Sequence, residues 1–140
     1  DCLPLVQHLL NKAAIKIVRE DSATRLVLMN KTELQQVVVN LVVNAIHAMS
    51  NGGQLTLRTF DSAVNDRLGV SIEVADTGVG MSAEVMGRIF DPFFTTKRRQ
   101  GTGLGLSITQ TLVSRQGGRI TVESELGRGT TFAVWLPEAN

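Results

Sequence analysis

The chain has 140 residues, of which 43% are hydrophobic and 19% are charged, and its formal net charge is +1. This composition is typical of one folded domain with a sizeable core and excludes a disordered chain. The near-neutral charge gives no support to nucleic-acid binding or to a role on a membrane surface.

The number of cysteines and the length of the apolar runs bear on the cellular compartment of the protein. The single cysteine, Cys2, forms no internal disulfide, which suits a reducing compartment such as the cytoplasm. No apolar run reaches the roughly 18 residues of a membrane span, and no signal-peptide pattern opens the chain. Because the first residue is Asp, we expect a fragment of a longer protein.

The periodicity predicts helices and strands in an irregular order. The longest helix follows Asn30, a predicted N-cap, and its valine run has poor helix propensity, so we expect it to pack on a sheet. The order does not follow a βαβαβ succession and favours a two-layer α/β sandwich. The predicted elements are a helix over 2–13, strands over 15–18 and 25–29, the long helix over 30–49, strands over 54–60 and 69–76, a short helix near 82–88, a loop over 90–102, a helix over 103–116, and strands over 118–125 and 129–136.

The stretch DTGVGM, residues 76–81, places a carboxylate at the end of a predicted strand. Asp76 shares the parity of Val70, Ile72 and Val74, so its side chain is predicted to lie on the buried face. A buried carboxylate is costly unless a hydrogen-bond donor reaches it. Either the chain supplies that donor, or the site leaves room for a donor that arrives with a ligand.

Two asparagines interrupt the apolar long helix. Asn40 and Asn44 are four residues apart and share one helix face, with His47 one turn further on. One interpretation is a pair of buried amides bonded to backbone. The other is a site in which amide oxygens bind Mg²⁺, a hard cation that prefers oxygen ligands. His47 by itself is typical of a structural histidine.

Two glycine clusters follow. Gly78 and Gly80 formally match a dinucleotide fingerprint, but the next helix is short and Phe-Asp-Pro interrupts the expected second strand, so we reject it. The cluster GTGLGL leads into a helix, where free backbone N–H groups can face an anion; a flexible hinge is the alternative. It is not a P-loop. The basic run before it, Lys97, Arg98 and Arg99, is either a solvated face or a group that closes over phosphates.

These stretches together resemble the catalytic and ATP-binding domain of bacterial sensor histidine kinases, in the GHKL superfamily. LQQVVVNLVVNAIHAM resembles the asparagine box, DTGVGM the first glycine box, IFDPFFTTK the phenylalanine box and GTGLGL the second glycine box. GRGTTFAVWLP resembles the C-terminal ending of the family. The resemblance implies a Bergerat-type α/β sandwich over residues 1–140, with a mixed, mostly antiparallel sheet covered on one face by about three helices, and a mobile ATP lid at 90–102.

The resemblance also implies roles for particular residues. Asp76 accepts a hydrogen bond from the adenine amine, Asn44 binds Mg²⁺, and Asn40 and Lys97 are the catalytic residues. Thr130 lies where relatives place a hydroxyl near the adenine. The residues implied in binding Mg²⁺-ATP are Asn40, Asn44, His47, Asp76, Gly78, Gly80, Met81, Phe90, Lys97, Arg98, Arg99, Gly101, Thr102, Gly103, Leu104, Gly105, Leu106 and Thr130.

The expected reaction is transfer of the γ-phosphoryl group to a histidine elsewhere. His8 lacks the acid and proline that follow the family's acceptor histidine, so the phosphoacceptor domain is expected outside this sequence. The expected partners are the dimerisation domain of the same kinase and a response regulator receiver domain, with a monomeric fragment, a homodimeric parent and a cytoplasmic location. The alternatives are a GHKL ATPase, which carries a glutamate base where Asn40 stands, a non-catalytic binding module, and a serine kinase of the anti-sigma type.

Overall fold

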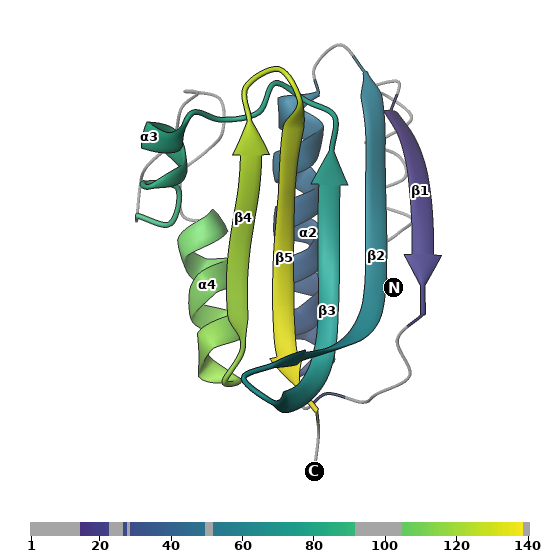
Figure 1. The fold of residues 1–140 in the computed structure, drawn as a ribbon, viewed down its shortest axis with the longest axis vertical. Helices are drawn as coiled ribbons and strands as arrows, with labels where there is room; N and C mark the ends of the chain where they lie inside the picture. The colour runs from purple at the N-terminus through teal and green to yellow at the C-terminus, as the bar shows by residue number, and fades with distance from the viewer. Residues whose placement is uncertain (1–14, 23–26, 28, 50–51, 92–104, 139–140) are drawn as a thin grey trace.

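The computed structural model describes residues 15–22, 27, 29–49, 52–91 and 105–138. Its described part is one sheet with helices behind it (Figure 1). The elements, in chain order, are β1 (Ile15–Asp21), α2 (Lys31–Ala48), β2 (Gly53–Val64), β3 (Arg67–Asp76), α3 (Ala83–Met86), α4 (Gly105–Arg115), β4 (Arg119–Glu125) and β5 (Gly129–Pro137).

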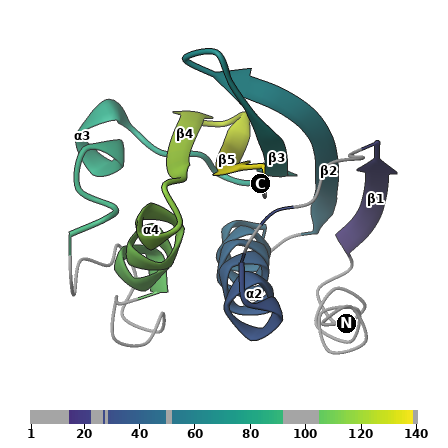
Figure 2. The same cartoon turned by 90° about the horizontal axis from the view of Figure 1, so that it is seen from below.

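The sheet has five strands in the order β1-β2-β3-β5-β4. Only β1 and β2 pair in parallel, and every other neighbouring pair is antiparallel. Figure 2 shows two layers, with α2 and α4 side by side under one face of the sheet. The predicted two-layer sandwich with a mixed, mostly antiparallel sheet is therefore confirmed.

Helix α2 begins as the sequence predicts. The side chain of Asn30 accepts hydrogen bonds from the backbone N–H groups of Thr32 (2.8 Å) and Glu33 (3.2 Å), which satisfies two of the free donors at the helix start. Its apolar stripe, which includes the fully buried Val37 and Leu41, packs on the sheet. Burial of this stripe offsets the poor helix propensity of the valine run.

The inner face of the sheet carries the core. Leu55 on β2, Val74 on β3, and Phe132 and Val134 on β5 are each at most 2% exposed and pack against α2 and α4. Asp76 has the same parity as Val74, so it lies on this inner face at the end of β3. The predicted burial of the Asp76 carboxylate is confirmed, because the side chain is 8% exposed.

The hairpin between β2 and β3 curls over the outer face of the sheet (Figures 1 and 2). Its turn residues, Asn65 and Asp66, both have positive φ (51° and 66°), as a tight turn between twisted strands requires. Beneath the curl, the indole of Trp135 on β5 is 7% exposed, and its Nε1 donates to the carbonyl oxygen of Ser62 at 3.4 Å. This residue therefore lies on the side of the sheet opposite to Asp76.

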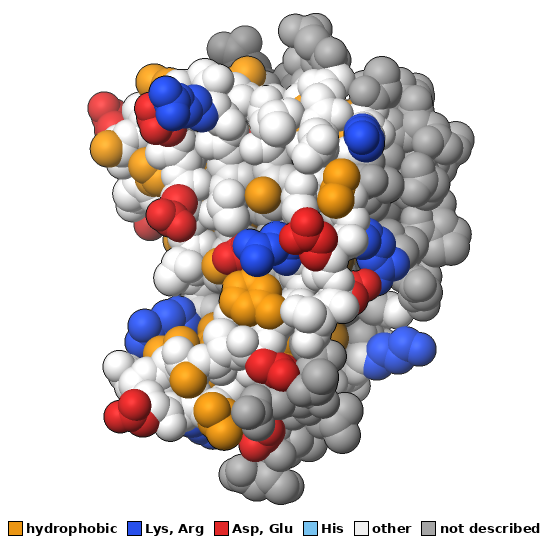
Figure 3. Space-filling model, turned by 45° about the vertical axis from the view of Figure 1, so that its right-hand side comes forward, with side chains coloured by type: hydrophobic (Ala, Val, Ile, Leu, Met, Phe, Trp, Pro, Cys, Tyr) orange, Lys and Arg blue, Asp and Glu red, His pale blue; other side chains and the backbone are white. Residues whose placement is uncertain are grey.

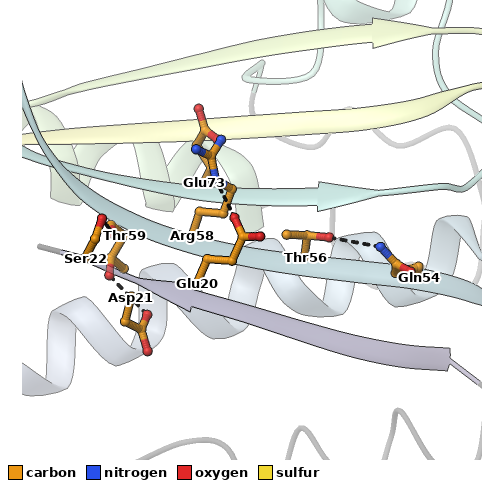
Figure 4. Close-up of polar contacts among 8 residues, drawn as sticks. All are labelled: Glu20, Asp21, Ser22, Gln54, Thr56, Arg58, Thr59 and Glu73. Atoms are coloured by element: carbon orange, nitrogen blue, oxygen red, sulfur yellow. Dashed lines mark hydrogen bonds and ion pairs between the residues drawn. The ribbon is translucent and has the colours of Figure 1, made fainter.

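Polar side chains connect the edge strand β1 to its neighbours (Figure 4). The guanidinium of Arg58 on β2 pairs with Glu20 on β1 at 3.0 Å and with Glu73 on β3 at 2.7 Å, and it stacks over the ring of Phe60. Figure 3 shows acidic and basic side chains close together on the described part of this side, so it carries no extended field of one sign. Exposed pairs of this kind contribute about 0–1 kcal/mol each.

Several predicted boundaries differ from the structure. Strand β2 continues to Val64, four residues beyond its predicted end, because the hairpin turn is short. Of the predicted strand 25–29 only residues 27 and 29 are described, and Val27 forms a single bridge with Glu138. The predicted helix 2–13 and most of the predicted lid lie outside the described residues. None of the helices in the described part is long and apolar enough to cross a membrane.

Candidate functional site

The carboxylate of Asp76 is held by backbone donors at the end of β3. Its Oδ1 accepts hydrogen bonds from the N–H of Gly78 (2.8 Å) and from the N–H of Thr130 on β5 (3.3 Å). Burial raises the pKa of Asp76, and these two backbone hydrogen bonds act in the opposite direction. The chain thus supplies donors to one oxygen of the buried carboxylate.

The second oxygen of this carboxylate, Oδ2, has a different environment. Among the described residues none donates a hydrogen bond to Oδ2 of Asp76. Because a buried carboxylate oxygen without a donor is costly, this is a place where a ligand N–H gains a strong hydrogen bond. The expected internal donors are therefore confirmed at Oδ1, whereas a donor that arrives with a ligand at Oδ2 stays a prediction.

Thr130, whose N–H donates to Asp76, forms a pair of hydroxyl groups with Ser124. Thr130 is 6% exposed, and its Oγ1 lies 2.7 Å from the Oγ of Ser124 on β4. Ser124 also accepts from the N–H of Met81 (2.8 Å) and donates to the carbonyl oxygen of Gly129 (3.0 Å). One serine therefore joins β4, β5 and the stretch after β3.

Ser124 was missed in the sequence analysis. It shares the parity of Ile120 and Val122, which pack against the core, so a hydroxyl on that apolar face was the signal that could have found it.

The glycines of the DTGVGM stretch make room for the chain's own backbone. A Cβ on Gly78 would lie 2.3 Å from the carbonyl oxygen of Ala48, at the end of α2. Gly80 has a φ of +72°, and a Cβ there would lie 2.0 Å from the carbonyl oxygen of Glu125. The N–H of Val79 donates to Ala48 at 3.1 Å. The family resemblance implies these two glycines in nucleotide binding, and close packing of the chain's own backbone is an additional reason for glycine at both positions.

Asn40 connects α2 to the start of α4. Its Nδ2 donates to the carbonyl oxygen of Gly105 (3.3 Å) and to Oγ1 of Thr109 (3.1 Å). The NH₂ group of Asn40 is therefore bonded to backbone, as one interpretation expected, although the side chain is half-buried and its second partner is a hydroxyl. The contact also ties the last glycine of GTGLGL to the helix that carries both asparagines.

Asn44 lies one helical turn before Ala48, the residue that contacts Gly78, so it stands close to the stretch that follows Asp76. Its side chain is half-buried and makes no hydrogen bond with the described residues. His47, which is half-buried on the same helix, has an interaction partner. Asn44 is therefore without a hydrogen-bond partner among the described residues, whereas His47 has a contact within the protein.

The structure also places two apolar residues of the predicted site. Phe90 packs edge-to-face on Phe132 with ring centroids 6.5 Å apart, which anchors the start of the predicted lid on the core. Leu106 packs against the same core from α4. The remaining predicted site residues lie outside the described part of the chain; they are Lys97, Arg98, Arg99, Gly101, Thr102, Gly103 and Leu104.

Comparison with known proteins gives a consistent class. Residues 29–140 match the family described as "Histidine kinase-, DNA gyrase B-, and HSP90-like ATPase". Sensor kinase CckA of Brucella abortus is 46% identical over 117 residues, which cover 75% of this chain and 12% of CckA. This chain therefore spans only a small part of the full-length sensor kinase.

Solved structures support the same class. The catalytic domain of histidine kinase ThkA has a TM-score of 0.82 and 33% identity, covering 97% of this chain and 87% of that domain. ThkA is also known in complex with the response regulator TrrA. Full-length ShkA in complex with AMPPNP has a TM-score of 0.79 and 30% identity, covering all of this chain and 30% of ShkA.

The chain therefore belongs to the histidine kinase-, DNA gyrase B- and HSP90-like ATPase family, and its fold is that of the histidine kinase catalytic domains. The predicted family and fold are confirmed. As a member of this family it is an ATP-binding domain, and two oxygen atoms of the candidate site fit an adenine nucleotide with its metal ion. The free Oδ2 of Asp76 suits the exocyclic amine of the base, and the amide of Asn44 offers an oxygen of the kind that Mg²⁺ binds.

Proposed function

We propose that this domain binds Mg²⁺-ATP and donates the γ-phosphoryl group to a histidine on a separate dimerisation domain, as a protein-histidine kinase in two-component signalling. We place the domain over residues 1–140 and its reaction in the cytoplasm, where ATP is available. Asn40 and its hydrogen-bond partners are the observation that favours a histidine kinase over an ATPase of the same family.

The neighbours of Asn40 suit an amide and oppose a carboxylate. Its NH₂ group meets two acceptors, the carbonyl oxygen of Gly105 and the hydroxyl oxygen of Thr109. The hydroxyl proton of Thr109 is already donated to Gly105 at 2.7 Å. An acid at this position would face the carbonyl oxygen of Gly105 with no proton to share at neutral pH, and it could take the proton of Thr109 only at the expense of the bond to Gly105. This argues against the ATPase alternative, in which a general base on this helix activates water.

The residues divide the work of binding and positioning. Asp76 holds the adenine through Oδ2, Asn44 supplies the protein ligand for Mg²⁺, and Lys97, with Arg98 and Arg99, contacts the phosphates. Among the described residues no group of three or more His, Cys, Asp or Glu could hold a metal ion. We assign Mg²⁺ to the amide oxygen of Asn44 together with phosphate oxygens and water, because Mg²⁺ prefers oxygen ligands and keeps several waters. Phosphoryl transfer depends mainly on positioning and on charge stabilisation, so this set of residues is sufficient.

The similar proteins suggest the partners. ShkA was solved with AMPPNP and ThkA with the response regulator TrrA, and we propose that this domain likewise binds ATP and acts in a kinase that phosphorylates a response regulator. The acceptor histidine is supplied by a dimerisation domain of the parent kinase, which we propose to be a homodimer.

The test is transfer of radiolabelled γ-phosphate from ATP, first with this domain alone and then with the parent's dimerisation domain added. We expect slow phosphate release from the domain alone, because Asn40 offers no general base to activate water. We also expect no labelling of it, because His8 lacks the acceptor context and His47 lies too close to Asn44 on a rigid helix to be in line with the γ-phosphate. Acid-labile labelling of the dimerisation domain should appear on mixing. Strong acid-labile labelling of this domain alone would refute the division of roles, and rapid phosphate release would favour the ATPase alternative.

A further inference from the structure

Thr109 is a buried polar residue that the family motifs quoted above do not include. It lies in α4, one turn after Gly105, with its side chain on the core side at 0% exposure. Its hydroxyl donates to the carbonyl oxygen of Gly105 at 2.7 Å and accepts from Nδ2 of Asn40 at 3.1 Å. Thr109 follows Leu106 and precedes Val113 at helical spacing, so it occupies a position otherwise filled by apolar side chains.

The proton count at Thr109 fixes the orientation of the Asn40 amide. A hydroxyl has one proton, and that of Thr109 is donated to Gly105. Towards Asn40 the hydroxyl can therefore only accept. The carbonyl oxygen of Gly105, also an acceptor, lies 3.3 Å from the same Nδ2. A flipped amide would place its oxygen against the carbonyl oxygen of Gly105, and it would gain the proton of Thr109 only at the expense of the hydrogen bond to Gly105, so the NH₂ group faces α4.

The fixed orientation determines what Asn40 offers on its other side. With Nδ2 bound to α4, the carbonyl oxygen Oδ1 is the free polar atom of the side chain, and no described residue donates to it. Amide oxygens bind Mg²⁺ or accept hydrogen bonds from its water ligands, whereas an NH₂ group repels both. Asn44, on the same helix face one turn further on, is the proposed metal ligand.

We propose that Thr109 is a positioning residue that holds the Asn40 amide so that its oxygen, and not its NH₂ group, is offered to the hydrated Mg²⁺ of the bound nucleotide. The inference rests on the proposed function. Thr109 itself touches neither metal nor nucleotide. Its effect passes through Asn40, and it should therefore appear in the Mg²⁺ dependence of binding and not in nucleotide affinity as such.

The test compares two conservative substitutions, one without the hydroxyl and one with it. Thr109→Val removes the hydroxyl and keeps the branched form, and Thr109→Ser keeps the hydroxyl. Calorimetry gives the Kd of ADP with excess Mg²⁺ and with EDTA, and the ratio of the two is the Mg²⁺ enhancement. We expect Thr109→Val to lower this enhancement by about 3- to 10-fold, the size of one hydrogen bond, and Thr109→Ser to keep it within about twofold of wild type.

The ratio separates positioning from a structural role, because general loosening of the site changes both Kd values equally. An unchanged enhancement in Thr109→Val would overturn the inference while leaving the proposed function intact. A wild-type domain that binds ADP without any Mg²⁺ enhancement would overturn both. If Thr109→Val fails to fold, ¹⁵N NMR of the side-chain NH₂ group of Asn40 provides the test. The proposal requires slowed hydrogen exchange of this group in the wild type and in Thr109→Ser. Exchange as fast as in an exposed asparagine would refute the fixed amide.

Discussion

Replacement of Asp76 by asparagine should weaken nucleotide binding without loss of the fold. The amide oxygen of an asparagine can accept both hydrogen bonds that Oδ1 of Asp76 accepts now, from Gly78 and Thr130. The second carboxylate oxygen becomes an NH₂ group, which meets the amine of adenine as donor against donor. The substitution therefore changes one atom of the site and leaves the internal hydrogen bonds in place.

The size of the effect follows from the hydrogen bond that is lost. A hydrogen bond to a charged group contributes about 1.5–3 kcal/mol, so the Kd for ATP or ADP should rise by roughly 10- to 150-fold. The donor-against-donor contact adds to this loss. The wild-type domain should also prefer ATP to GTP, because guanine carries a carbonyl oxygen where adenine carries its amine, and two acceptors repel.

Without nucleotide, Asp76→Asn should be more stable than the wild type at neutral pH, although it binds nucleotide more weakly. The pKa of Asp76 is raised by burial, so the empty fold disfavours the charged form. An acid with a raised pKa contributes stability at a pH below its ordinary value of 3.8, and that contribution is lost as the pH rises through the pKa in the folded state. The free energy of unfolding of the wild type, relative to Asp76→Asn, should therefore fall between acidic and neutral pH.

Two measurements test this reasoning. Calorimetry with ATP, ADP and GTP gives the loss of affinity and the base preference, and urea unfolding of both empty proteins over a pH series gives the stability difference. Equal binding of ATP and GTP by the wild type, or ATP affinity unchanged in Asp76→Asn, would refute the role of Oδ2. An empty Asp76→Asn domain that is clearly less stable than wild type at neutral pH would show that the carboxylate is structural instead.

Four further substitutions follow from the packing and the hydrogen bonds. Gly78→Ala should unfold or strongly destabilise the domain, because the new Cβ meets the backbone at Ala48. Gly105→Ala is the control, because nothing lies within 4 Å of its Cβ, and it should melt as the wild type does by circular dichroism. Ser124→Ala should cost about 1–3 kcal/mol in urea unfolding, because it leaves a backbone N–H unpaired; a cost near zero would contradict the hydroxyl network. Phe90→Ala should cost about 2 kcal/mol or more, and unchanged stability would refute its anchoring on the core.

Much of the fold could be predicted from local patterns. The alternation in β3 placed Asp76 on the buried face, and Asn30 was identified as an N-cap, because both depend on neighbours in sequence. The end of β2 was misplaced, since the polar Asp61 and Ser62 resemble a loop, and only the pairing across the hairpin shows that they belong to the strand. Long-range pairing of this kind leaves little trace in the sequence of one strand.

The site was predicted less completely than the fold. Asp76 and the two asparagines stood out because polar side chains on apolar faces are costly. Thr109 and Ser124 did not, because hydroxyl residues are common in helices and strands, and their partners lie 69 and 43 residues away in the chain. The neighbours of Gly78 and Gly80 could not be predicted either, since close backbone approach depends on how the elements pack.

Trp135 gives the domain a built-in optical probe. The chain contains one tryptophan and no tyrosine, so its fluorescence comes almost entirely from this indole. Because the ring is buried under the curl of the β2–β3 hairpin and hydrogen-bonded to Ser62, its emission should shift to longer wavelength when the hairpin comes off the sheet. The ring lies on the face of the sheet away from Asp76, so it should hardly respond to nucleotide. A fluorescence trace therefore follows unfolding alone, and a signal for binding requires a labelled nucleotide.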